Sequence, residues 1–180
     1  MDTQWPRYEV FVQEAEGKAH VHAGSVHATD PEIALLNARD VFVRRPECVS
    51  LWVVSASAVT EAMDTDNAAS PSTVRAPKER GSASVAFQVF GKLEPKGELT
   101  HLGRVLGRDG DDALREARAA FAERRPIVLW VVEDRAIERS AESDAAPLFD
   151  PAHDKPFRDQ SFYPIQTALR RLKDEGRDDS

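Results

Sequence analysis

The sequence has a single cysteine, Cys48, so it cannot form an intramolecular disulfide. A lone thiol suits a reducing compartment, and no run of residues approaches the ~20 apolar residues that a membrane-spanning helix needs. The first residues, 1–7, lack the apolar region of a signal peptide. These absences argue against a disulfide scaffold and a membrane protein, and we expect a bacterial cytoplasmic protein.

Positive charge is also in short supply. The chain carries 24 Lys and Arg against 31 Asp and Glu, which gives a formal net charge of −7. A nucleic-acid-binding domain usually presents a basic face. The acidic balance therefore argues against nucleic acid as a partner.

Motifs that would carry catalysis are missing as well. The sequence has no Gly-rich phosphate loop, no Ser nucleophile elbow and no Glu-x-x-His pair on either expected helix, so the chain does not build its own di-iron site. His20 and His22 should point to one face of a strand, but zinc sites use three or four ligands. We interpret both as surface or interface histidines, with metal binding as the alternative. Cys48 precedes a buried strand and is interpreted as a packed, inert thiol.

What the sequence does contain is one pattern that occurs twice. Matching positions are separated by 79 residues through most of the pattern and by 78 near its end. A constant offset indicates a duplicated unit, and two copies are too few for a solenoid, so we predict a fused pseudo-dimer. The matched pairs are Phe11 and Phe90, Gly24 and Gly103, Phe42 and Phe121, and Trp52 and Trp130.

Each copy has the pattern of strand, strand, helix, strand. The sequence therefore predicts an α+β fold of two such units, sharing or pairing their sheets, with the helices on one side. The expected strands are Tyr8–Gln13, His20–His27 and Val49–Val54 in the first copy, and Val85–Phe90, Leu99–Leu106 and Ile127–Val132 in the second.

The two expected helices have clear start signals. The first begins at Thr29 as a capping box or at Asp30 followed by Pro31, and the second at Asp109 or Asp111. Apolar residues near the 3.6-residue period predict a core-facing side on each helix. For the first helix these residues are Ile33, Ala34, Ala38, Val41 and Phe42.

Two further segments complete the expected organisation, with units at residues 1–60 and 85–140. Residues 61–84 are rich in Ala, Ser, Thr, Asp and Pro and are predicted to be a flexible linker. Residues 141–180 form an extended aromatic tail in which Phe149, Phe157, Phe162 and Tyr163 stand among prolines and need a surface to lie on. A short amphipathic helix is expected near its end, from Ile165 to Leu172.

These stretches resemble the PaaB family, the B subunit of the multicomponent phenylacetyl-CoA ring 1,2-epoxidase. The likeness covers most of copy one and the tail, whereas an ordinary family member resembles one copy plus the tail. The second copy departs from it, since Asp40 becomes Ala119 and His27 becomes Leu106. The stretches that carry the resemblance are Trp5–Val12, His20–Ala28, Ala34–Phe42, Arg44-Arg45, Val49–Val54, Phe149–Ala152, Lys155, Phe157-Arg158 and Ser161–Tyr163.

The resemblance implies a non-catalytic subunit that bridges the catalytic and supporting oxygenase subunits in phenylacetate degradation. No cofactor is expected in this chain, because a di-iron centre, a flavin and an iron–sulfur cluster would reside in partner subunits. We expect copy one and the tail to make the partner contacts, while copy two completes the scaffold. The expected partner-binding residues are His20, His22, Arg39, Asp40, Phe157, Phe162 and Tyr163.

Two other functions remain open from the sequence. A small-molecule-sensing module would be favoured by a pocket between the units lined by Arg44, Arg45, Arg124 and Arg125. A stand-alone metalloenzyme would use His20 and His22.

Overall fold

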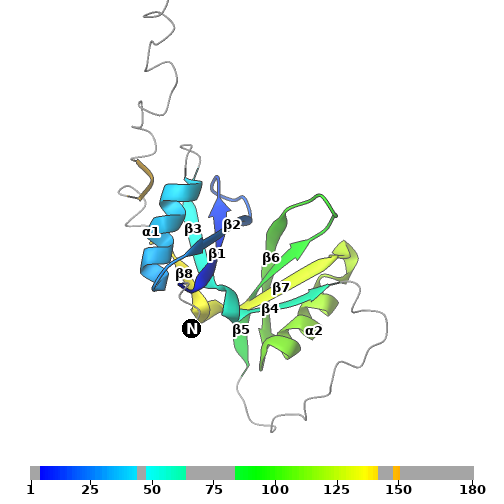
Figure 1. The fold of residues 1–180 in the computed structure, drawn as a ribbon. Helices are drawn as coiled ribbons and strands as arrows, with labels where there is room; N and C mark the ends of the chain where they lie inside the picture. The colour runs from blue at the N-terminus through cyan, green and yellow to red at the C-terminus, as the bar shows by residue number, and fades with distance from the viewer. Residues whose placement is uncertain (1–4, 44–47, 64–83, 142–147, 151–180) are drawn as a thin grey trace, which may run out of the picture.

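The computed structural model describes residues 5–43, 48–63, 84–141 and 148–150 (Figure 1). The α+β class predicted from the sequence is confirmed, and each half carries one strand more than predicted. The first half contains β1 (Arg7–Gln13), β2 (Val21–His27), α1 (Pro31–Phe42), β3 (Ser50–Ser55), the 3₁₀ turn η1 (Ala56–Ala58) and β4 (Val59–Met63). The second half contains β5 (Val85–Lys92), β6 (Leu99–Gly107), α2 (Gly110–Ala120), η3 (Ala122–Arg124), β7 (Val128–Glu133), η4 (Asp134–Ala136) and β8 (Ile137–Arg139).

All eight strands belong to one antiparallel sheet, in the order β4-β7-β5-β6-β2-β1-β3-β8. Strand β4 ends the first half in sequence but pairs with β7 of the second half. Strand β8 ends the second half but pairs with β3 of the first. Each half therefore completes the sheet of the other by a reciprocal exchange of strands, as in a domain-swapped dimer.

This exchange corrects a predicted boundary. The sequence predicts a linker from residue 61, but residues 61–63 form the end of β4, where they pair with residues 128–130 of β7. Backbone pairing to a strand of the other half extends the ordered segment beyond residue 60. The rest of the predicted linker, residues 64–83, lies outside the described residues.

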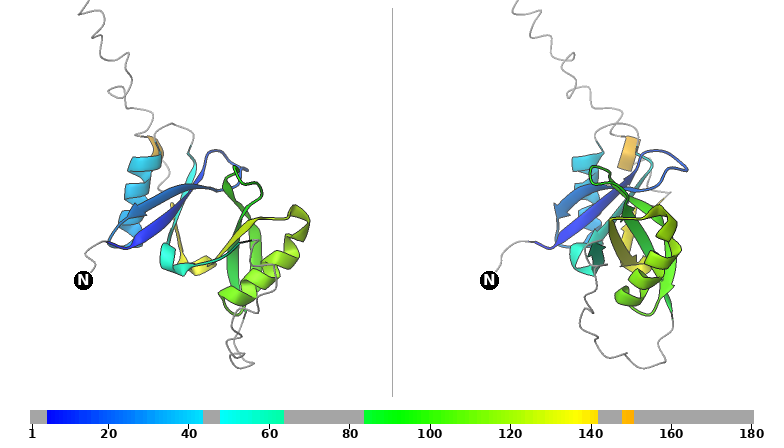
Figure 2. Two further views of the ribbon diagram at one scale, coloured as in Figure 1. Left: turned by 45° about the vertical axis from the view of Figure 1, so that its right-hand side comes forward. Right: turned by 90° about the vertical axis from the view of Figure 1, so that its right-hand side faces the viewer.

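The two halves meet in the sheet at a narrow seam between β2 and β6. Val21 lies opposite Thr100 there, and the His101 N–H donates to the His20 carbonyl oxygen at 2.8 Å. On either side of the seam, each helix covers the outer face of its own half and the inner faces turn toward each other (Figure 2). The helices thus lie on one face of a strongly curved sheet.

Three buried clusters follow from this layering. One lies under α1, one lies under α2, and the third joins the inner faces of the two halves. Strand β1 serves two of them, since Val10 packs under α1 and Phe11 in the inner cluster, and both are 0% exposed. Both faces of this strand are therefore covered.

The helix starts are decided in favour of aspartate. The Asp30 carboxylate accepts a hydrogen bond from the Ile33 N–H at 2.9 Å, and Asp109 accepts one from the Asp112 N–H at 2.8 Å. The hydrogen bond from Ile33 holds the pKa of Asp30 below its usual value. Both caps satisfy backbone donors that a helix leaves unpaired at its first turn.

A repeated glycine explains how the end of each helix packs on the sheet. Gly24 in β2 and Gly103 in β6 have φ angles of +141° and +149°, a region that side chains disfavour. A Cβ atom on Gly24 would lie 2.9 Å from the Phe42 ring, and one on Gly103 would lie 3.2 Å from the Phe121 ring. Glycine therefore lets the aromatic ring that ends each helical segment lie against the strand.

Candidate partner-binding surface and the interface between the halves

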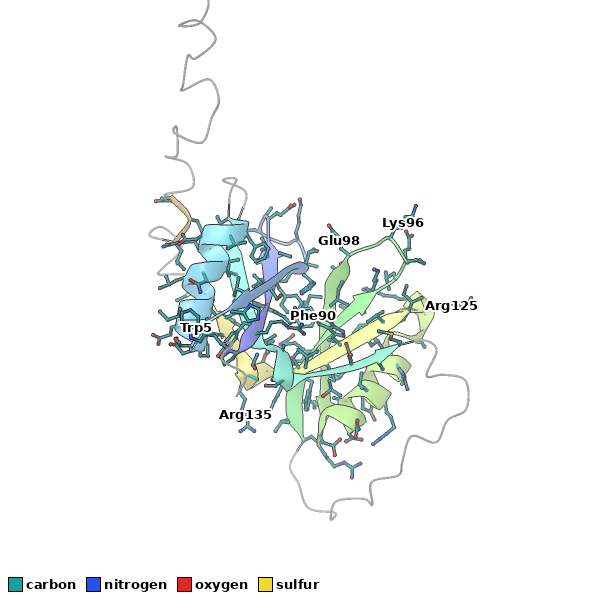
Figure 3. All side chains as sticks on the ribbon, in the orientation of Figure 1. Trp5, Phe90, Lys96, Glu98, Arg125 and Arg135 are labelled. Carbon is teal, nitrogen blue, oxygen red and sulfur yellow. The ribbon has the colours of Figure 1, made fainter. Side chains whose placement is uncertain are left out.

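The interface between the halves is built on aromatic rings related by the internal repeat. Phe11 and Phe90 stack with ring centroids 4.0 Å apart, and Phe90 lies between the two halves in Figure 3. His22 packs against Phe11 at 5.3 Å, and its counterpart His101 packs against Phe90 at the same distance. Each histidine also meets the tryptophan of the other half, in the pairs His22–Trp130 and His101–Trp52. The repeat therefore forms its own pseudo-dimer interface.

The polar groups beside these rings differ between the halves. In the first half Glu9 is 5% exposed, accepts from Arg7 Nε at 3.0 Å and lies 2.8 Å from His22 Nε2. In the second half the residue equivalent to Glu9 is Gln88, which lies 2.7 Å from His101 Nε2. The symmetric rings are thus held by an acidic side chain on one side and an amide on the other.

Gln88 also contacts an ion pair formed by Asp134 and Arg139. Gln88 Nε2 donates to Asp134 Oδ1 at 2.6 Å, and Arg139 Nη2 binds the same oxygen at 2.6 Å. The hydrogen bond from Gln88, followed by the Arg139 charge, lowers the pKa of Asp134. Arg139 belongs to the exchanged strand β8, so this network ties that strand into the interface.

His20 lies inside this interface rather than on the outer surface. It is 6% exposed, its ring stacks on Trp52 at 3.7 Å, and its Nε2 lies 3.0 Å from Ser50 Oγ. Burial, followed by the proximity of His101 and Arg139, lowers the pKa of His20 to about 4, so the ring is neutral at neutral pH. His20 and His22 share one face, as predicted, and their role toward another subunit stays a prediction.

Candidate chemistry elsewhere is limited in the described part of the chain. No group of three or more His, Cys, Asp or Glu side chains could hold a metal ion among these residues. Cys48 is buried, and that burial raises the pKa of its thiol to about 11, which agrees with an inert thiol. None of the described helices is long and apolar enough to span a bilayer.

The outer face of α1 departs from the sequence prediction. The periodicity predicts Ile33 and Val41 in the core, but they are 39% and 44% exposed, and Leu36 beside them is 41% exposed. Ala34 and Ala38 are buried as predicted, and their small side chains let the helix lie close to the sheet. One helix face can be buried at a time, so these apolar residues stay exposed, and Ile33 and Leu36 lie one turn apart on the outer side.

The second helix carries no such patch. At an offset of 79 residues, Asp112 and Arg115 of α2 stand where α1 has Ile33 and Leu36. Asp112 binds Arg108 and Arg115 at 2.9 and 2.6 Å, and the hydrogen bonds from Arg108 hold its pKa well below the usual range. The exposed apolar face is therefore a property of the first half alone.

The other predicted site residues fall in two groups. Arg39 and Asp40 lie on α1, joined by an ion pair at 2.9 Å, with 29% and 63% of their side chains exposed. Phe157, Phe162 and Tyr163 lie outside the described residues, as do Arg44 and Arg45 of the sensing alternative. Arg124 and Arg125 do not line one cavity together. The Arg124 guanidinium lies 5.9 Å from the centre of the Phe121 ring, whereas Arg125 lines a cavity that Arg124 does not line.

The start of the tail returns to the first half. Leu148 and Phe149 are 8% and 6% exposed and belong to the cluster under α1 (Figures 1 and 2). The expectation that the tail aromatics need a surface is confirmed for Phe149. The exposed face of α1 was missed, although the sequence held a signal: its apolar residues are too many for one helix face.

The sequence is similar to known proteins. The B subunit of 1,2-phenylacetyl-CoA epoxidase from Escherichia coli strain K12 is 54% identical over 55 residues, which is 31% of this chain and 58% of the relative. No solved structure matches the chain significantly. The family described as "Phenylacetic acid degradation B" matches twice, over residues 4–78 and 84–170, as a tandem duplication would. Because these two matches cover most of the sequence, the chain belongs to the PaaB family.

Proposed function

We propose that this chain is a non-catalytic subunit that bridges the catalytic and supporting subunits of a phenylacetyl-CoA epoxidase. The name of the Escherichia coli relative supports the assembly, and family membership supports a role in phenylacetic acid degradation. The chain itself holds no cofactor in this proposal. The di-iron, flavin and iron–sulfur groups reside in the partner subunits.

The observation that carries the bridging role is the exposed apolar face of α1. Ile33 and Leu36, one helical turn apart, are exposed on α1, and their counterparts on α2 are the charged residues Asp112 and Arg115. An apolar patch present in only one of two similar halves is not needed to fold the unit. Clustered exposed apolar residues mark protein–protein contacts.

The tail extends this contact surface. Leu148 and Phe149 fix the start of the tail in the cluster under α1, so the residues that follow begin at the first half. Phe157, Phe162 and Tyr163 then supply aromatic anchors, the residue type that contributes most to interface hot spots. Arg39 and Asp40 add charged groups on the same helix as the apolar patch.

Two substitutions test the face of α1 directly. Ile33→Asp combined with Leu36→Arg gives α1 the residues that α2 uses at the equivalent positions, so the fold should be kept. We expect recovery of the co-expressed epoxidase subunits on this chain to fall at least tenfold, with an unchanged melting temperature.

The tail is tested separately. Phe162→Ala with Tyr163→Ala should also weaken recovery of the epoxidase subunits.

The matched control is Arg115→Glu, an exposed position of α2 equivalent to Leu36. This variant should recover the partner subunits as well as the parent chain does. Equal recovery by the α1 variant and the parent would overturn the assignment of α1 as the bridging surface.

A further inference from the structure

A cavity of about 350 Å³ lies where the second helical segment meets the exchanged strand β4. Its floor is apolar, because Leu129 of β7 is 3% exposed and Ala62 of β4 is 7% exposed. Ala122 and Pro126 form its wall at the end of the helical segment, and Arg118 and Arg125 stand around it. The cavity, which Met63 also lines, therefore combines apolar side chains with two arginines.

The first half has an equivalent place, which can be located by strand register. Ala62 pairs with Leu129 in the second half. At an offset of 78 residues, Ser140 corresponds to Ala62 and Leu51 corresponds to Leu129. Ser140 and Leu51 are also paired, because the Ser140 N–H donates to the Leu51 carbonyl oxygen at 2.9 Å. Val43 corresponds to Ala122 at an offset of 79.

In the first half the start of the tail packs into the buried cluster that contains this place. Leu148 and Phe149 share a buried cluster with Val43 and Leu51, and Val43 is only 2% exposed. Its counterpart Ala122 is exposed. The cluster around this position thus includes a Leu-Phe pair in one half, whereas the equivalent position borders a cavity in the other.

The chain has only one such tail to offer. A residue equivalent to Leu148 or Phe149 after β4 would fall at Ser70 or Pro71, neither of which is a large apolar residue. The chain's own Leu-Phe pair is already buried in the first half, and withdrawing it would expose Val43 and Leu51 to water. Leu148 and Phe149 of the same chain are therefore not free to fill this cavity.

We propose that this cavity binds a short segment of another protein chain, in which a bulky aliphatic residue and an aromatic residue are followed by an acidic one. The first two fill the depression as Leu148 and Phe149 fill its counterpart. The acidic residue, which matches Asp150 in the tail, faces Arg118 and Arg125. This docking site is separate from the face of α1 and does not depend on the identity of the partners bound there.

The probe is a fluorescent peptide with the sequence of residues 145–152, added to the full chain and followed by anisotropy. We expect saturable binding that weakens at least tenfold when the peptide carries Phe149→Ala. Ala122→Glu in the protein places a carboxylate in the cavity wall and should weaken binding at least tenfold. Ala120→Glu is the matched control, because Ala120 is exposed on the same helical segment but does not line the cavity.

Charge exchange tests the two arginines. Arg118→Glu should weaken the parent peptide at least threefold, and an Asp150→Lys peptide should recover affinity for that variant. A benzophenone at peptide position 149 should cross-link to residues of α2, η3 or β4. Equal melting temperatures for all variants show that the fold is kept.

Three outcomes overturn the proposal. The first is that the peptide shows no saturable binding at millimolar concentration. The second is that Ala122→Glu leaves binding unchanged, or that all cross-links fall in the first half. The third is a dimer of the chain that both Ala122→Glu and Phe149→Ala abolish, since the occupant would then be the tail of a second copy.

Discussion

His20 is buried, although the sequence left both a surface and an interface position open for it. Its sequence neighbours suggest a polar strand, yet the ring is stacked on Trp52 and lies near Arg139 of the exchanged strand β8. The equivalent residue of the second half is Leu99, which is also buried. A neutral imidazole thus occupies a position where the repeat otherwise uses an apolar side chain.

This environment predicts that stability falls in acid. The unfolded chain takes up a proton on His20 near pH 6.5, whereas the folded chain does so only near pH 4. The free energy of unfolding is therefore not reduced by His20 above about pH 6.5, and it declines as the pH falls from 6.5 toward 4. Burial also lowers the pKa of His101, which contributes in the same direction.

His20→Leu should flatten this decline, as measured by chemical denaturation at several pH values. The control is His27→Leu, because His27 is exposed and its counterpart in the second half is Leu106. An unchanged slope in the His20 variant would contradict the assignment of the acid sensitivity to that ring.

Cys48 should resist modification while the protein is folded. A pKa near 11 leaves roughly a hundredfold less thiolate at pH 8 than an ordinary cysteine has, and burial limits access further. We expect one thiol per chain to react with a disulfide reagent in guanidinium and almost none in buffer. Rapid stoichiometric reaction of the folded chain would show that the cysteine is accessible.

Among the elements, strands β2 and β6 depend on their repeated glycines. Gly24→Ala should destabilise the protein by about 2 kcal/mol or more, because the backbone is strained and the new methyl group meets the Phe42 ring. Thermal or urea unfolding would measure the loss. Gly17→Ala is the comparison, since its φ is +78° but no atom lies within 4 Å of the new Cβ; it should cost only about 1 kcal/mol.

If Gly24→Ala and Gly17→Ala lowered the free energy of unfolding equally, the contact with the Phe42 ring would not contribute to the loss. A Gly24→Ala, Phe42→Leu double variant should recover part of the loss, because the smaller side chain relieves the contact.

At the same scale, helix α1 shows how far element prediction reached. The Asp-Pro start signal placed its first turn correctly, because capping depends on residues within one turn. The same sequence did not reveal which of its apolar residues would be buried. That choice depends on the sheet against which the helix packs.

At the scale of the whole molecule, the exchanged strands predict that the two halves assemble without a covalent link. A chain cut within residues 64–83 should give two fragments that co-purify in equal amounts, because β4 and β8 each pair with the other half. Each fragment alone should aggregate, since it lacks one strand and exposes the inner aromatic cluster.

Modest shortening within the same segment of the intact chain should barely change the melting temperature, because halving a loop changes its closure free energy by only about 0.6 kcal/mol. For the cut chain of the preceding prediction, two fragments that fold separately and do not associate would contradict the reciprocal exchange.

The proposed subunit role also predicts the behaviour of the purified chain. Alone, it should bind no stoichiometric iron and should not turn over phenylacetyl-CoA, because neither α1 nor α2 carries the Glu-x-x-His motif of a di-iron site. Elemental analysis and product assays measure both. Stoichiometric iron, or turnover without other subunits, would overturn the non-catalytic assignment.

The sequence by itself determined the two similar units, the α+β class, the approximate helix starts and the buried cysteine. These depend on repeated residues and on short-range patterns, which remain legible along the chain. Family membership follows from the same residues.

The tertiary structure alone decided the exchange of β4 and β8, the burial of His20 and the exposed face of α1. An apolar strand pairs equally well with its own half or with the other, so residues 59–63 do not encode their partner locally. His20 is neutral because the folded chain buries its ring and a distant strand carries Arg139 to it, and Ala122 is exposed because the only Leu-Phe pair follows the other exchanged strand. Such contacts join residues far apart in sequence, and only the folded chain brings them together.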